Sequence, residues 1–388
     1  MPRSLIALVV LTAMAVVFAA CGGGDDGGRG DGAATAGSGD FGTGLKLGAS
    51  MSDPPKVGAS VAPWYVWNAD DCKFEETDDH PAEYGADTRK IEGNAPQLGY
   101  MHYGNTDPFG VAVSKSIESE AEAAGMDVNV YNLKFPSRTE PSAQANVSVV
   151  KGDDVIVQAN LDPTVLPEYF KIIEGDGCIP SIQLFIPIDD HPGMGNHWPD
   201  VGETIGTYTA ETAKERGWKP EDTALVQCTD RDSGPTVNVM FEHVPAAMTK
   251  AGFELPEDNV FNVVCGLTDT QSGFKKVTDW YTGHPQFEHV AFSAIDSIRM
   301  TEMARAVKEQ GNSREDSILS AGADDESSRR LVRNGDQDMS VAFFGERFGQ
   351  WIVPMVEDIL AGNPVPSFVG TELVPLTQDN IDEYYPSN

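Results

Sequence analysis

The stretch that decides the fold reads Tyr100-Met101-His102-Tyr103-Gly104-Asn105-Thr106-Asp107-Pro108-Phe109. It joins a short apolar segment to a turn of small and polar residues, and residues 111–124 follow with apolar side chains at helical spacing. Gly125 is suited to end that helix, because glycine adopts the left-handed conformation of a C-cap without steric cost. Residues 128–131 are the next apolar segment, so the sequence predicts a strand, a helix and a second strand in succession.

The same alternation continues to the C-terminus in two successive sets. The first set contains strands at 154–158 and 180–186 and helices at 140–149 and 165–175. The second set contains strands at 223–228, 259–265, 288–292, 317–321 and 339–343, helices at 204–215, 237–251, 268–282, 297–310, 326–333 and 348–361, and a last extended segment at 368–376. Strands that alternate with helices predict parallel sheets, so we expect an α/β protein with two similar α/β/α lobes.

The N-terminus indicates export. Arg3 precedes an apolar run from Leu5 to Ala20, which predicts a signal peptide over residues 1–20. Phe18-Ala19-Ala20-Cys21 resembles the lipobox of bacterial lipoproteins, and this resemblance implies cleavage before Cys21 and acylation of that residue. The alternative is an ordinary secretory signal that leaves Cys21 unmodified. In both cases we expect a location outside the cytoplasm, and the lipoprotein alternative implies anchorage at the extracytoplasmic face of the cell membrane, periplasmic or cell-surface.

Composition excludes some partners. The chain has 60 acidic and 27 basic residues and a formal net charge of −33. Such a surface repels nucleic acid, so we expect no binding of DNA or RNA. No segment beyond the signal approaches the roughly 20 apolar residues that a membrane helix needs, so we expect the N-terminal lipid to be the membrane attachment. We expect the protein to be a monomer.

Two segments precede the first predicted strand. Residues 21–60 are rich in Gly, Ser, Ala and Asp and are expected to form a flexible tether. Residues 61–96 carry three large aromatic side chains, at Trp64, Tyr65 and Trp67, and are expected to form an extension that packs on the main body. The acidic run at 70–79 lacks the spacing of an EF-hand, so we expect a solvated loop rather than a calcium site.

Four cysteines remain besides Cys21. An even number in an exported chain suggests disulfides, with three possible pairings, and four free thiols are the alternative. Cys228 and Cys265 each end a predicted strand in consecutive units, and such strands usually lie side by side about 4.8 Å apart. We therefore expect a bond between Cys228 and Cys265 and, by elimination, one between Cys72 and Cys178.

The sequence lacks the motifs of common hydrolases and nucleotide-binding enzymes, namely GxSxG, HExxH and the P-loop. We therefore expect a protein that is not an enzyme and needs no cofactor. The loop at 189–198 contains two aspartates and two histidines, which are suitable metal ligands. These four residues are explained equally well by a polar surface loop, by a crossover between lobes or by a role in ligand binding. We therefore expect no metal site.

Several stretches together resemble the type I periplasmic binding proteins, in particular the ribose- and galactose-binding branch that serves ABC sugar importers. They are Tyr100–Phe109, Gly177–Ile182, His284–Phe292, Ile295-Asp296, Gly322-Ala323-Asp324 and Thr371–Ile381. The resemblance covers about residues 97–388 and depends on the order and spacing of these stretches.

The resemblance implies two lobes joined by a hinge of three crossovers. One lobe is expected to contain residues 97–199 and 344–372, and the other 200–343 and 373–388. It also implies that a small, sugar-like molecule is captured in the cleft between lobes and delivered to the permease subunits of an ABC importer. The alternative is a ligand sensor of a receptor-kinase or chemotaxis pathway that uses the same fold.

The resemblance also implies which residues bind the ligand. They are Asp107, Phe109, Phe185, Asn238, Asp296, Asp324 and Phe343. Phe109 and Phe343 are expected to stack on the ligand, Asp107 and Asp324 to accept hydrogen bonds, and Asp296 to contribute nearby or at the hinge. Phe185, Asn238 and Phe343 replace charged or more polar residues of the family, so we expect a ligand that is less polar than ribose.

Overall fold

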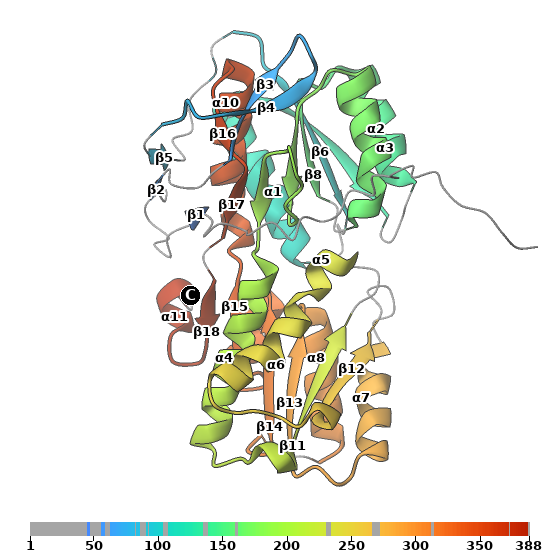
Figure 1. The fold of residues 1–388 in the computed structure, drawn as a ribbon, viewed down its shortest axis with the longest axis vertical. Helices are drawn as coiled ribbons and strands as arrows, with labels where there is room; N and C mark the ends of the chain where they lie inside the picture. The colour runs from blue at the N-terminus through green and yellow to red at the C-terminus, as the bar shows by residue number, and fades with distance from the viewer. Residues whose placement is uncertain are drawn as a thin grey trace, which may run out of the picture. The chain divides into compact units, whose positions relative to one another are not determined.

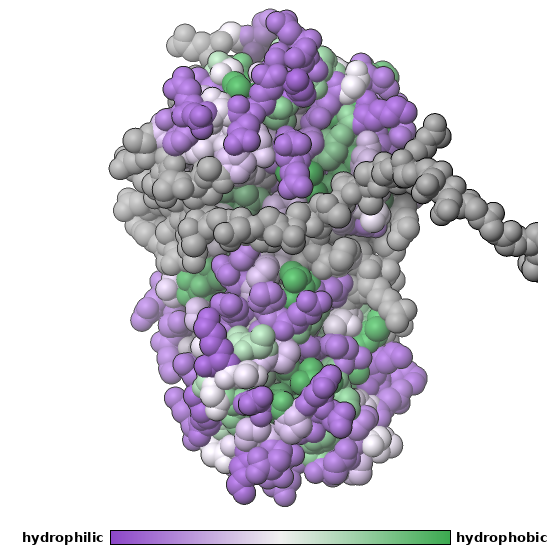
Figure 2. All heavy atoms as spheres, viewed as in Figure 1, coloured by the Kyte–Doolittle hydropathy of each residue, from purple (hydrophilic) through white to green (hydrophobic). Residues whose placement is uncertain are grey.

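The computed structural model describes residues 45–46, 56–58, 63–81, 83–85, 91, 93–103, 108–134, 139–159, 162–229, 234–265, 272–311, 314–371 and 373–386. The expected signal peptide and Cys21 lie outside these residues. Within them, no helix combines the length and the apolar character needed to cross a membrane. Hydrophilic side chains cover most of the described surface on the face drawn in Figure 2, consistent with the strongly acidic composition.

The first sheet is entirely parallel and has seven strands (Figure 1). Their order is β1 (Leu45–Lys46), β17 (Phe368–Gly370), β10 (Gly193–Gly195), β9 (Ser181–Leu184), β8 (Val155–Ala159), β6 (Gln97–Tyr103) and β7 (Asp127–Leu133). Its helices are α1 (Pro108–Ala124), α2 (Glu140–Lys151), α3 (Leu166–Phe170) and α10 (Gly349–Ala361). Helix α1 packs against α10, and α2 packs against α3.

The second sheet has six strands, of which only the last is antiparallel to its neighbour. Their order is β12 (Val260–Val264), β11 (Thr223–Thr229), β13 (His289–Ala294), β14 (Ser317–Gly322), β15 (Met339–Ala342) and β18 (Val374–Leu376). Its helices are α4 (Trp198–Glu215), α5 (Gly234–Asn238), α6 (Met240–Lys250), α7 (Ser272–Gly283), α8 (Ser297–Glu309), α9 (Glu326–Asn334) and α11 (Ile381–Tyr384).

Successive residues of the second sheet are buried in different hydrophobic clusters. Leu225 and Ile318 belong to a cluster that includes side chains of α4 and α6, whereas Val226 and Leu319 belong to one that includes side chains of α7 and α8. Because successive side chains of a strand point to opposite faces, this sheet is covered by helices on both sides. The prediction of an α/β protein built on two parallel sheets flanked by helices is confirmed.

Glycines end two helices of this framework, close to the helix ends predicted at residues 333 and 361. Gly335 follows α9 with φ 73°, and Gly362 follows α10 with φ 72°. Both donate their backbone N–H to carbonyls of the last turn, which the left-handed conformation allows.

From β6 onward the chain passes between the sheets three times. The passages lie between β10 and α4, between β15 and α10, and between β17 and β18. We propose residues 97–199 with 344–372 as the first lobe and residues 200–343 with 373–388 as the second lobe.

The structure corrects three element predictions. The loop at 189–198 contains the buried strand β10, whose Gly-Met-Gly sequence carries no strand signal. Gly195 allows close packing there, because a Cβ atom on it would lie 2.5 Å from the Cα of Phe185. The helix predicted at 165–175 divides into α3 and a wider π-helical turn, and the segment at 368–376 divides into β17 and β18, one in each sheet.

The N-terminal extension forms a small sheet of its own. Strands β3 (Trp64–Asn68) and β4 (Lys73–Thr77) form a hairpin, and β3 also pairs with β16 (Val365–Pro366). The acidic run is therefore partly a strand rather than the solvated loop that we predicted. Trp64 is only 1% exposed, so the extension packs its aromatic side chains as expected.

The predicted tether at 21–60 is not wholly without structure. Leu45–Lys46 forms β1 beside β17, and β2 (Lys56–Gly58) pairs with β5 (Glu83–Gly85). The prediction of a tether is wrong for these two segments, because backbone hydrogen bonds to neighbouring strands need no large apolar side chain.

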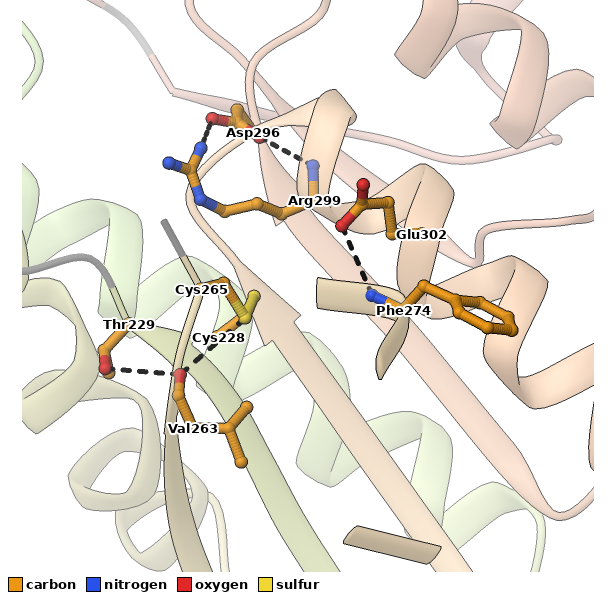
Figure 3. The surroundings of a disulfide bond; sticks show 8 residues. All are labelled: Cys228, Thr229, Val263, Cys265, Phe274, Asp296, Arg299 and Glu302. Atoms are coloured by element: carbon orange, nitrogen blue, oxygen red, sulfur yellow. Dashed lines mark hydrogen bonds and ion pairs between the residues drawn. A yellow bond between two sulfur atoms is a disulfide. The ribbon is translucent and has the colours of Figure 1, made fainter. Parts of the chain in front are cut away.

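Two disulfides join the four cysteines in the pairs that the sequence analysis gives. Cys72 is bonded to Cys178, with a Cα–Cα distance of 4.9 Å, and ties the extension to the first lobe. Cys228 is bonded to Cys265, with a Cα–Cα distance of 5.5 Å (Figure 3). Strands β11 and β12 are neighbours in the second sheet, as the argument for this pair requires.

Candidate ligand-binding site

The predicted site residues follow the carboxyl ends of parallel strands. Phe185 directly follows β9, and Phe343 directly follows β15. Asp296 and Asp324 each lie two residues after a strand, β13 and β14 respectively, and Phe109 lies in the first turn of α1 after β6. Ligands of open α/β sheets bind at this edge, so these side chains are placed where a ligand site is expected.

Three of the predicted residues meet in one aromatic cluster. The ring centroid of Phe109 lies 5.9 Å from that of Phe185 and 5.7 Å from that of Phe343. The ring centroid of Phe348 lies 5.8 Å from that of Phe109, and the ring centroid of Trp198 lies 5.8 Å from that of Phe343. We call these five residues the aromatic cluster. It joins residues of both lobes, since Phe343 closes β15 whereas Phe109 and Phe185 belong to the first lobe.

The backbone beside the aromatic cluster adopts unusual conformations. Phe185 has φ 72°, Ala323 has φ 65° and Phe344 has φ 52°. Residues with a side chain rarely adopt these left-handed values, and such conformations gather at functional sites. The indole of Trp198 donates a 2.9 Å hydrogen bond to the Phe185 carbonyl, which helps to hold that turn.

Asp324 is a buried carboxyl group at the end of β14, with 2% of its surface exposed. Its oxygens accept hydrogen bonds from the backbone N–H groups of Phe343 and Phe344, each at 3.1 Å, and from the phenol of Tyr385. Burial raises its pKa to about 6, and the negative charge of Glu346 acts in the same direction. Asp324 therefore accepts hydrogen bonds as predicted, but three of them come from the protein itself.

A cavity of about 720 Å³ opens beside Phe109 and Asp324. One wall is a face of α1 that includes Lys115, and the facing wall is the start of α9 with Asp325 and Arg329. The cavity is within the roughly 300–1,000 Å³ that is typical of small-molecule sites. It combines an aromatic ring with several charged groups, a combination that can hold a molecule with apolar faces and polar edges.

The other predicted ligand-binding residues do not line this cavity or lie outside the described residues. Asp107 lies outside the described residues. Asn238 ends α5, and its side-chain amide donates a 2.6 Å hydrogen bond to the Gly234 carbonyl. Asp296 caps α8 by accepting a 2.9 Å hydrogen bond from the backbone N–H of Arg299, and it forms an ion pair with the Arg299 guanidinium (Figure 3).

The histidines of the 189–198 loop have carboxylate partners. A ring nitrogen of His191 lies 3.0 Å from Glu174, and the His191 ring stacks on Phe170 with centroids 3.8 Å apart. The Nδ1 atom of His197 lies 2.8 Å from the Oδ1 atom of Asp200. Across the part of the chain that the structure describes, no three His, Cys, Asp or Glu residues are grouped so that they could hold a metal ion.

Three further residues contribute to the site and were not predicted from the sequence. Trp198 and Phe348 complete the aromatic cluster, and Tyr385 reaches Asp324 from the C-terminal segment. The aromatic residues that follow β15 were a usable signal for Phe348. Tyr385 lies 61 residues after Asp324, and no local pattern connects the two.

Sequence similarity to known proteins covers part of the chain. No family model matches the chain. An L-arabinose-binding periplasmic protein of an ABC transporter from Azospirillum brasilense is 24% identical over 123 residues, which cover 32% of this chain and 36% of that protein. The match thus spans about a third of the curated relative's length.

Solved structures match over most of the chain. A periplasmic ribose ABC transporter protein from Conexibacter woesei has a TM-score of 0.63 and 14% identity, covering 76% of this chain and 97% of that one. A glucose-galactose binding protein from Geobacillus stearothermophilus has a TM-score of 0.62 and 14% identity, covering 74% of this chain and 99% of that one. The chain therefore has the fold of the type I periplasmic sugar-binding proteins of ABC transporters.

Proposed function

We propose that this protein is an extracytoplasmic receptor that binds a sugar or sugar-like molecule and delivers it to the permease of an ABC importer. The observation that carries the proposal is the cavity beside Phe109 and Asp324, at the carboxyl ends of the strands. A sugar ring has apolar C–H faces and polar hydroxyl edges. An aromatic ring beside carboxyl groups complements both.

The cavity is partly apolar, because Phe109, Val111 and Ala112 contribute to its wall. Phe185 and Phe343, which we expected to face the ligand, are 7% and 2% exposed and pack against Phe109 without lining the cavity. Hydroxyl groups facing the apolar part of the wall would lose their hydrogen bonds to water, at a cost of about 1–3 kcal/mol each. We therefore propose a ligand with fewer hydroxyls than ribose on the side that faces Phe109.

The similar proteins support the same role. Their names describe an L-arabinose-binding protein of an ABC transporter, a periplasmic ribose ABC transporter, and a glucose-galactose binding protein. We propose the corresponding role for this chain, without an enzymatic step. We further propose that acylated Cys21 holds it on the extracytoplasmic face of the membrane.

A thermal-shift panel tests the proposal. The mature protein is heated with D-ribose, L-arabinose, D-glucose, D-galactose, and their deoxy and amino derivatives. A ligand at 100 times its Kd stabilises the folded state by about 2.7 kcal/mol, which gives a clear rise in Tm. The proposal predicts such a rise for at least one member of the panel. No rise with any of them at millimolar concentration would contradict it.

A further inference from the structure

We propose that Phe343 is a positioning residue of the ligand site, which fixes the placement of Phe109 in the first lobe relative to Asp324 in the second lobe without touching the ligand. The inference rests on the proposed function and deepens it, because it names a residue that couples the cavity to the arrangement of the two lobes. It is carried by the place of Phe343 in the chain and by its contacts with one cavity residue of each lobe.

Phe343 begins one of the three passages between the lobes. It directly follows β15 of the second lobe, and the chain then continues to α10 of the first lobe. The residue is 2% exposed and is not part of the cavity wall. A side chain at this point of the chain lies where the backbone must bend when the angle between the lobes changes.

The second lobe fixes both the backbone and the ring of Phe343. The backbone N–H donates a 3.1 Å hydrogen bond to the Oδ1 atom of Asp324, which lines the cavity. A Cβ atom on Gly322 of β14 would lie 2.7 Å from the Cζ atom of Phe343, so the ring packs directly on that strand. The ring has no room to move further toward β14, and its position therefore follows the second lobe.

The first lobe meets this ring through Phe109. The ring centroids of Phe109 and Phe343 lie 5.7 Å apart with an interplanar angle of 77°, which is a favourable edge-to-face contact. Phe109 also packs against Gly345 of the same passage, where a Cβ atom would lie 2.7 Å from its ring. Since Phe109 lines the cavity, the contact with Phe343 limits how closely one wall of the cavity approaches the other.

A second passage between the lobes reaches Phe343 through Trp198. Trp198 begins α4, directly after the passage from β10, and its ring centroid lies 5.8 Å from that of Phe343 at an interplanar angle of 84°. Phe343 thus contacts residues beside two of the three passages. A ligand that binds Phe109 and Asp324 favours the lobe arrangement in which these contacts are made, and the contacts favour the ligand by the same amount.

The distance between the lobes in the ligand-free protein tests the inference. Spin labels are attached to the mature Cys21→Ser chain at Val150→Cys in α2 and Lys308→Cys in α8, both of which are exposed. The other four cysteines are joined in disulfides, so the labels attach only to the introduced thiols. We expect Phe343→Leu to broaden the distance distribution from double electron–electron resonance and to shift its mean by about 2 Å or more.

Phe292→Leu is the matched control for the loss of a buried ring. Phe292 lies in β13 of the same sheet, is 1% exposed and packs with side chains of α7 and α8 away from the cavity. We expect it to lower Tm and to leave the distances and the affinity unchanged. Phe343→Met keeps more of the side-chain volume and can contact aromatic rings through sulfur, so it should give a smaller shift and provides the test if Phe343→Leu does not fold.

Calorimetry with the best sugar of the thermal-shift panel completes the test. We expect Phe343→Leu to raise Kd about fivefold or more, because apparent affinity falls with the fraction of molecules in the binding-competent arrangement. Weaker binding with wild-type distances would mean that Phe343 touches the ligand itself.

The outcomes distinguish the inference from the proposed function. Wild-type distances in Phe343→Leu, or altered distances with wild-type affinity, would overturn the inference and leave the sugar receptor standing. A panel without any binder would overturn the proposed function, whereas the ligand-free distances judge the role of Phe343 between the lobes on their own.

Discussion

The phenol of Tyr385 donates a hydrogen bond to the carboxyl group of Asp324. Tyr385 follows α11 near the C-terminus, whereas Asp324 lies between β14 and α9. The ring of Tyr385 also stacks near Phe344, with centroids 6.3 Å apart. The last segment of the chain is thereby fastened to the carboxyl end of the second sheet, beside the cavity.

Removing that phenol should loosen the C-terminal segment. We expect Tyr385→Phe to lower the free energy of unfolding by about 1–2 kcal/mol, because Asp324 is buried and loses one of its donors. The measurement is denaturant unfolding followed by tryptophan fluorescence. Tyr384→Phe is the matched control, since the Tyr384 ring also lies near Phe344 but its hydroxyl bonds to no described residue. Equal stability of the two variants would contradict the role given to Tyr385.

The raised pKa of Asp324 predicts a pH dependence of stability. Its pKa in the folded protein is about 6, above its ordinary value of 3.8, so the folded state holds this proton more tightly than the unfolded state. The stabilising contribution is fully present below about pH 4 and is lost as the pH rises through 6.

Asp324→Asn isolates this contribution, because asparagine does not titrate in that range. We expect the Tm of the wild type minus the Tm of the variant to fall between pH 4 and pH 7. The measurement is a series of thermal melts at both ends of that range and between them. A difference that stays constant, or that increases with pH, would contradict the assignment.

Much of the fold could be predicted because it follows from local pattern. Apolar segments alternate with amphipathic ones, and glycines such as Gly335 and Gly362 mark helix ends. Strand β10 could not be predicted in this way, since its two glycines allow close packing but show no preference for a strand. The division of residues 368–376 into β17 and β18 could not be predicted either. The two strands belong to different sheets, and only tertiary contacts distinguish them.

The site was harder to predict than the fold. Phe109, Phe185 and Phe343 could be placed together only through the resemblance, because Phe109 and Phe185 follow strands of the first sheet and Phe343 follows a strand of the second. The partners of Asp324 could not be anticipated, since Tyr385 is brought to it by the path of the C-terminal segment. The resemblance suggested a carboxylate free to bind ligand, whereas the structure shows one that already accepts three hydrogen bonds.

Replacing the proposed lipid-bearing cysteine should release the protein from the membrane. We expect Cys21→Ser to move the protein from the membrane fraction to the soluble fraction after cell fractionation. At least two acyl chains are needed for stable anchoring, so mass spectrometry of the wild-type N-terminal peptide should show more than one. A Cys21→Ser protein that stays in the membrane fraction would contradict the proposed anchor.

The two disulfides predict a defined pattern of linked peptides. Digestion without reducing agent should yield one peptide pair containing Cys72 and Cys178 and another containing Cys228 and Cys265. Replacing Cys72 and Cys178 together by Ser should lower the free energy of unfolding by about 2–4 kcal/mol, because the unfolded chain regains the freedom of a long loop. Four free thiols, or crossed pairs, would contradict this prediction.

The affinity of the Phe109→Ala protein for the best sugar of the thermal-shift panel tests the central claim most directly. Phe109 lines the cavity and contacts three other aromatic rings, whereas Phe287 lies before β13, at the opposite end of its sheet. Loss of a stacked ring costs about 0.5–1.5 kcal/mol beyond the buried area, so calorimetry should show binding weakened about two- to tenfold or more in Phe109→Ala. Phe287→Ala should bind like the wild type. Unchanged affinity in Phe109→Ala would contradict a sugar site at this cavity.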